Sequence, residues 1–168
     1  MEQGALGSCY LLAAFVGLDA RPGALENIFY TKEINGAGIY AMKLYMNGRP
    51  IVVHVDDFIP VKKFHKFGRE GYFPPYAHSS VEGEIWPMIG EKIWAKLTGS
   101  YANAESGAVS WVLGHVTNDY NFQYSPHTDL DKSWEKTKEW SRREYLQMIG
   151  TSPTSYVGGS HAFVILKA

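Results

Sequence analysis

A helix signal that is apolar on almost every side constrains the fold of this chain most. Residues 9–18 read Cys-Tyr-Leu-Leu-Ala-Ala-Phe-Val-Gly-Leu, and a helix of that composition is buried all round rather than lying on a surface. The uninterrupted apolar run, residues 10–18, is too short to cross a bilayer. Ser8 is a suitable N-cap for this helix, and Arg21-Pro22-Gly23 is expected to end it. The rest of the chain must therefore supply elements that surround one central helix.

The first half of the chain also predicts a hairpin and a second helix. Residues 39–46 alternate in polarity, Asn47-Gly48 forms the favoured two-residue turn, and residues 49–58 return. His54 and Asp56 would share a strand face, which allows a metal site, although Asp56-Asp57 more simply ends the strand. Residues 62–84 show no periodicity and predict a loop. Trp86-Pro87 begins a helix that ends at residues 98–100.

The second half gives weaker signals. Residues 108–116 predict a short helix, and residues 118–126 fit either a strand or a loop. Residues 130–149 resemble a polar surface helix or an insertion, with Trp134, Trp140 and Tyr145 as expected anchors. A last strand is expected over residues 162–167, directly after His161.

Composition limits the class of function. The chain has 168 residues, enough for one domain or two small lobes. Its net charge is −1, from 16 basic and 17 acidic residues, so we expect no nucleic-acid partner. No secretory signal or transmembrane segment is recognisable. A single cysteine excludes an internal disulfide and favours a reducing, cytoplasmic location.

That single cysteine, Cys9, stands where a nucleophile would be activated. The first turn of a helix presents the positive end of the helix dipole, which favours the thiolate form. Gly4 and Gly7 are expected to leave the backbone open to a substrate carbonyl. The Gln3 side-chain amide and the Cys9 backbone N–H would be two donors of an oxyanion hole. His161, at the start of the last strand, would serve as the general base. A lone cysteine in an apolar helix is more often simply a buried small side chain.

Several segments in register resemble the calpain family of cysteine proteases. The segment from Gln3 to Ala14, Gln-Gly-Ala-Leu-Gly-Ser-Cys-Tyr-Leu-Leu-Ala-Ala, resembles the active-site segment of that family. Further matches follow in order along nearly the whole chain: Glu26-Asn27-Ile28-Phe29, Gly38-Ile39-Tyr40, Asn47-Gly48, Val55-Asp56-Asp57-Phe58-Ile59-Pro60, the helix from Trp86 to Tyr101, and Ser160-His161-Ala162-Phe163.

The resemblance implies an α+β, papain-like fold with two lobes and the active site between them. Residues 1–114 would form the first lobe, with the cysteine helix, and residues 115–168 the start of an incomplete second lobe. It implies a calcium-regulated cysteine endopeptidase acting on protein substrates, with further calpain domains in the full-length chain. Its catalytic residues fall on Cys9, His161 and Gln3, and one acidic calcium ligand falls on Glu82.

Departures from the family pattern keep alternatives open. Ser8, Tyr10 and Ser160 replace the family's usual Asp, Trp and Gly. The family's third triad member is an Asn in an Asn-Pro-Trp-Gly motif beyond the histidine, and this chain contains no such motif. We therefore expect a fragment ending before that Asn. The alternative is a catalytically inactive calpain homologue, or a fragment, that binds proteins through its cleft. A different thiol acyltransferase, such as a transglutaminase, is a weaker alternative.

Overall fold

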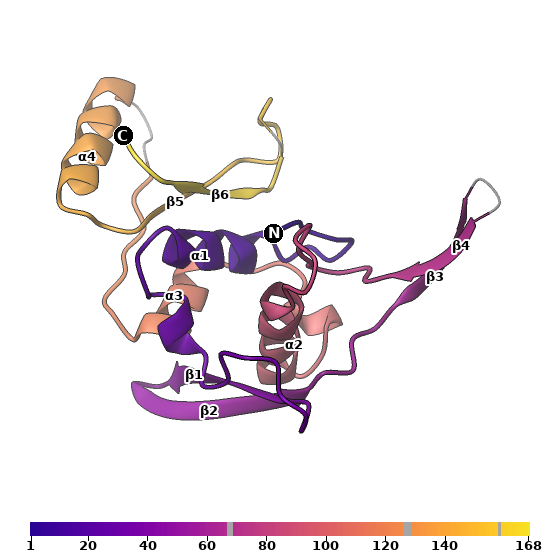
Figure 1. Cartoon of the computed structure of the whole chain (residues 1–168). Coiled ribbons are helices and arrows are strands. Elements are labelled where there is room, and N and C mark those ends of the chain that lie inside the picture. Colours follow the sequence, from indigo (N-terminus) through magenta and orange to yellow (C-terminus); the bar gives the residue numbers. More distant parts are fainter. Residues whose placement is uncertain (67–68, 126–128, 158) are drawn as a thin grey trace. The chain divides into compact units, whose positions relative to one another are not determined.

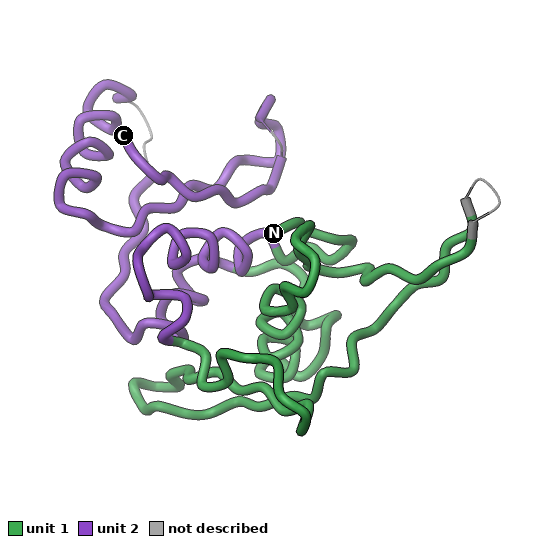
Figure 2. Tube along the Cα trace, in the orientation of Figure 1, with its two compact units in different colours: residues 1–8, 28–107 green, residues 9–27, 108–168 purple. Residues whose placement is uncertain are grey.

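The computed structural model describes residues 1–66, 69–125, 129–157 and 159–168. Within them, α-helices and short antiparallel hairpins follow one another along the chain, which confirms the α+β class (Figure 1). The chain divides into two compact units. Unit 1 contains residues 1–8 and 28–107, and unit 2 contains residues 9–27 and 108–168 (Figure 2). Units defined by contacts need not coincide with protease lobes, so the lobe boundary after residue 114 stays a prediction.

The core of unit 1 is a hairpin covered by a helix. β1 (Ile39–Met46) pairs with β2 (Arg49–Asp56), and α2 (Trp86–Thr98) packs against both strands. Asn47 and Gly48 have φ values of 52° and 75°, as the predicted two-residue turn requires. Alternate residues of the two strands are buried together with one side of α2. The buried strand residues are Tyr40, Met42, Leu44, Val53 and Val55, and the buried helix residues include Ile89, Ile93 and Trp94.

The prediction of a loop over residues 62–84 was wrong in part, because this range contains two strands. β3 (Lys62–Lys66) and β4 (Arg69–Phe73) form an antiparallel hairpin. Its described side chains are mostly exposed, including Phe64 and Tyr72. A strand pair with no buried face has no hydrophobic alternation for sequence analysis to detect, since alternation reflects burial of one face.

Unit 2 is built around the expected apolar helix. α1 (Cys9–Asp19) is buried along nearly its whole length and packs against α3 (Val109–Thr117), a helix that the sequence predicted. The hairpin of β5 (Gln147–Gly150) and β6 (Ala162–Ile165) also lies on α1 (Figure 1). Two short 3-10 turns, Glu26–Ile28 and Ala102–Ala104, complete the elements of the described residues.

The segment after α3 differs from the prediction in two ways. α4 (Leu130–Arg142) ends earlier than residue 149, and β5 follows it. Trp134 and Tyr145 are 53% and 45% exposed, so they are not buried anchors. Residues 118–125 form neither helix nor strand, and residue 126 lies outside the described residues. The described helices are all too short, or too polar, to span a membrane.

Candidate active site

Cys9 is the first residue of α1, as predicted, and its thiol is free and partly exposed. The residues before it form a loop of unit 1 that several backbone hydrogen bonds hold. Glu2 and His78 exchange two backbone bonds of 2.7 and 3.0 Å, and the Ala5 N–H donates to the Pro75 carbonyl at 2.7 Å. The loop leading to the cysteine is therefore anchored along residues 75–78.

Gly4 is needed for a different reason from the one expected. A Cβ at this position would lie 2.3 Å from the Pro75 carbonyl oxygen and 2.4 Å from that of Tyr76. Gly4 thus allows the loop to approach the protein's own backbone, and the expectation that it leaves the backbone open to substrate is wrong. At Gly7, a Cβ would lie 3.1 Å from the Glu105 side chain.

The residue before the cysteine is held by a buried carboxyl group that sequence analysis missed. Ser8 is fully buried, and its hydroxyl donates to Glu91 Oε1 at 2.5 Å. The other carboxyl oxygen of Glu91 accepts the Ala77 backbone N–H at 2.9 Å. Burial raises the pKa of Glu91, while its bonds to Ser8 and Ala77 act in the opposite direction. A sequence signal existed, because Glu91 shares a helix face with the buried residues Pro87 and Trp94.

Gln3 is exposed in unit 1, and its side-chain Nε2 donates to the Leu6 carbonyl at 2.8 Å. This bond ties the Gln3 side chain to the backbone three residues further along the chain. Its role as an oxyanion donor stays a prediction.

His161 directly precedes β6, as predicted, and it is partly buried. Thr151 holds its backbone on both sides: the Thr151 N–H donates to the His161 carbonyl at 2.9 Å, and the His161 N–H donates to Thr151 Oγ1 at 3.0 Å. The imidazole packs edge-on against Phe163, with ring centroids 4.8 Å apart and an interplanar angle of 78°. Phe163 therefore orients a ring for which the sequence offered no obvious partner.

The elements that carry Cys9 and His161 belong to the same compact unit and pack against each other. Gly17 makes this packing close, because a Cβ there would lie 2.7 Å from Met148 Cε and 3.3 Å from Val164 Cγ2. A larger side chain at Gly17 would push β5 and β6 away from α1. The structure thus brings the cysteine helix and the histidine strand together, with α1 beginning at Cys9 and β6 following His161.

Glu82 lies exposed in the turn before α2. Within the described ranges, no group of three or more His, Cys, Asp or Glu side chains is arranged to hold a metal ion. His54 and Asp56 belong to no such group among these residues, and the Asp56 carboxylate is paired with Lys92. Calcium binding at Glu82 stays a prediction.

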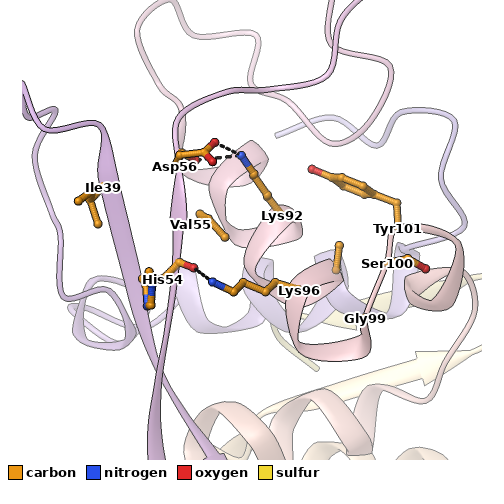
Figure 3. A pocket seen from close by; sticks show the side chains of 10 residues that line it. Ile39, His54, Val55, Asp56, Lys92, Lys96, Gly99, Ser100 and Tyr101 are labelled. Atoms are coloured by element: carbon orange, nitrogen blue, oxygen red, sulfur yellow. Dashed lines mark hydrogen bonds and ion pairs between the residues drawn. The ribbon is translucent and has the colours of Figure 1, made fainter.

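A hollow of about 510 Å³ in unit 1 contains none of the predicted catalytic residues (Figure 3). Lys92 and Lys96 line it and extend from α2 to the edge of β2, where their ammonium groups donate to backbone carbonyls. Lys92 donates to the carbonyls of Asp56 and Phe58 at 3.1 and 2.7 Å, and Lys96 to that of His54 at 2.6 Å. Both lysines therefore join the helix to the strand.

Comparison with known proteins identifies the family. The model of the calpain family cysteine proteases matches residues 1–160, which include Gln3, Cys9 and Glu82 and end just before His161. The calpain-type cysteine protease DEK1 of Zea mays is 31% identical over 180 residues, covering 98% of this chain and 8% of that protein. The calpain-1 catalytic subunit of Homo sapiens is 34% identical over 131 residues, covering 74% of this chain and 17% of that protein.

This chain belongs to the calpain family of cysteine proteases. It spans less than a tenth of the plant relative's length and less than a fifth of the human relative's length.

Proposed function

We propose that this chain carries the nucleophile and the general base of a calpain-like cysteine endopeptidase with a papain-like, two-lobed core. One observation carries the proposal: in a chain of this family, Cys9 begins a buried helix against which the strand following His161 packs. An imidazole close to a thiol can accept its proton, which prepares the sulfur to attack a carbonyl carbon. Membership of a protease family supports protein substrates.

The proposed reaction proceeds through an acyl-enzyme. His161 takes the proton of the Cys9 thiol, and the sulfur attacks the peptide carbonyl carbon while the carbonyl electron pair moves to oxygen. Gln3 and the Cys9 N–H would donate to that oxyanion. The C–N bond then breaks, and the leaving amine takes the proton from His161. Water next gives a proton to His161 and attacks the thioester. The C–S bond then breaks, the sulfur takes that proton from His161, and the acid is released.

A thiol-reactive peptide probe tests the roles of Cys9 and His161. Because Cys9 is the sole cysteine, the labelled site is unambiguous, and Cys9→Ala should abolish labelling. Removing the general base with His161→Ala should slow labelling at neutral pH by about a hundredfold or more. The matched control is His65→Ala, on the exposed hairpin, which should label at the wild-type rate.

The same measurements distinguish an active protease from a catalytically inactive, protein-binding homologue. Labelling that is equally fast in His161→Ala would contradict the catalytic pair. If iodoacetamide alkylates Cys9 of the wild-type chain but the peptide probe does not react with it, the inactive, protein-binding homologue is favoured.

The proposal also includes calcium binding at Glu82 and further calpain domains, which family membership supports. It includes a cytoplasmic location, which the lone free thiol supports. No catalytic step is assigned to the ion. Calorimetric titration with calcium chloride should show heat that falls in Glu82→Gln and persists in Glu33→Gln, another exposed position. Equal heats for the two variants would remove Glu82 from the site.

A further inference from the structure

Glu91 bonds to the residue before Cys9 and to the segment of residues 75–78 that holds the loop carrying Gln3. Glu91 is 1% exposed, so its hydrogen bonds are made with little competition from water. One oxygen accepts the Ser8 hydroxyl and the other accepts the Ala77 N–H. The two partners lie 83 and 14 residues away in the sequence.

The bond from Ser8 to Glu91 restricts the orientation of the Cys9 N–H. Ser8 and Cys9 share one peptide plane, and the Cys9 N–H lies in that plane. A buried, hydrogen-bonded Ser8 side chain limits the rotation of this plane about the Ser8 backbone. The distance of 2.5 Å between Ser8 Oγ and Glu91 Oε1 is that of a direct hydrogen bond between two oxygens.

The bond from Ala77 to Glu91 supports the backbone around Gln3. Ala77 lies within residues 75–78, which hold Glu2 and Ala5 through three backbone hydrogen bonds. Gln3 lies between those two residues. A shift of Ala77 would therefore move the backbone from which the Gln3 amide extends.

We propose that Glu91 is a positioning residue for the oxyanion site: its two oxygens hold the Ser8–Cys9 peptide and the segment of residues 75–78 that supports the backbone on both sides of Gln3. This inference rests on the proposed protease function and assigns that reaction a residue beyond the cysteine, histidine and glutamine. Glu91 does not touch substrate, and it acts through Ser8 and Ala77.

A pair of probes distinguishes positioning from simple stabilisation. Iodoacetamide alkylates a thiolate without forming an oxyanion. A peptide aldehyde forms a hemithioacetal, in which sulfur bonds to carbon and the carbonyl oxygen receives charge before it takes the imidazolium proton. Only the second reaction needs the oxyanion donors.

Ser8→Ala and Glu91→Ala should weaken aldehyde binding, with a loss approaching a hundredfold for a donor misplaced by about 1 Å. Their iodoacetamide rates should change by less than about threefold, because Cys9 keeps its place at the helix start. Glu91→Gln should recover most of the affinity, since its amide can donate to Ser8 Oγ and accept from Ala77. The matched control is Thr98→Ala, which removes a hydroxyl bonded to the Trp94 carbonyl elsewhere on α2.

Each outcome decides the proposal. Glu91→Ala alone can fail to fold, so the decision rests on Ser8→Ala and Glu91→Gln, each compared at matched folded fractions. Aldehyde affinity that stays at the wild-type level in Ser8→Ala, or falls in parallel with the alkylation rate, would overturn the positioning role while leaving the protease function intact. A wild-type chain that alkylates normally and binds no aldehyde would overturn the protease function, and the positioning role with it.

Discussion

At the scale of single residues, the burial of Glu91 creates a conflict between solvation and hydrogen bonding. Ser8 and Glu91 are the buried polar side chains of the described residues. Desolvation raises the pKa of Glu91 above its ordinary value of 4.5, although the bonds from Ser8 and Ala77 and the nearby His78 oppose this rise. The folded protein therefore holds the Glu91 proton more tightly than the unfolded chain does.

This difference predicts how stability changes with pH. A raised folded-state pKa means that the Glu91 contribution is fully present below pH 4.5 and is lost as pH rises through the folded-state value. Glu91→Gln, which cannot ionise, should lack this loss. Urea unfolding from pH 4 upward should show the wild type losing stability relative to Glu91→Gln.

The exposed Glu33→Gln serves as the control and should follow the wild type across the same range. A wild type that gains stability over Glu91→Gln as pH rises would show instead that hydrogen bonding to the ionised carboxylate outweighs burial.

At the scale of elements, Lys92 joins α2 to the end of β2. Its ammonium group donates to two backbone carbonyls and to the Asp56 carboxylate, while its side chain remains only 18% exposed. The Lys92 hydrogen bond is the largest influence lowering the pKa of Asp56. The neighbouring Lys96 donates to the His54 carbonyl.

We expect Lys92→Met to lower the melting temperature by about 2–4 °C for each kcal/mol by which it lowers the free energy of unfolding. The decrease should be larger than that caused by Lys96→Met. The Asp56 contribution is present above pH 3.8 and is lost as pH falls through the lower, folded-state pKa. The gap between wild type and Lys92→Met should therefore narrow in acid. Differential scanning calorimetry at neutral and acidic pH measures both effects. Equal shifts for the two lysine variants would mean that the carbonyl contacts of Lys92 add nothing.

Elements whose signals are local were predictable, and those that depend on distant partners were less so. The turn at Asn47-Gly48 and the left-handed cap at Gly99, with φ of 100°, depend on the conformational freedom of a few neighbouring residues. The β3–β4 hairpin and the short β5 strand lacked such signals. Neither has a strongly buried face, so their patterns of polar and apolar residues carry little information.

At the scale of the whole molecule, family membership accounts for the order of motifs along the chain, while the units show which segments fold together. α1 is separated in sequence from residues 108–168, yet they form one compact unit. The cysteine and histidine of the proposed site therefore belong to one unit, although most of the chain lies between them.

The candidate site was predictable in its residue types and less so in its support. Cys9, Gln3 and His161 could be selected because their chemistry and spacing are visible in the sequence. Phe163 beside His161, and Glu91 beneath Ser8, emerge only from packing. Their roles depend on contacts whose energy is gained only when the chain is folded.

The amino-acid sequence alone determined the buried helix beginning at Cys9, the hairpin turn, the second helix and the family, because these depend on short patterns and on ordered motifs. Tertiary structure decided why Gly4 and Gly17 are glycines and where the carboxyl group of Glu91 lies. The physical reason is that backbone approach and burial of charge involve atoms from distant segments, which no local pattern of residues encodes.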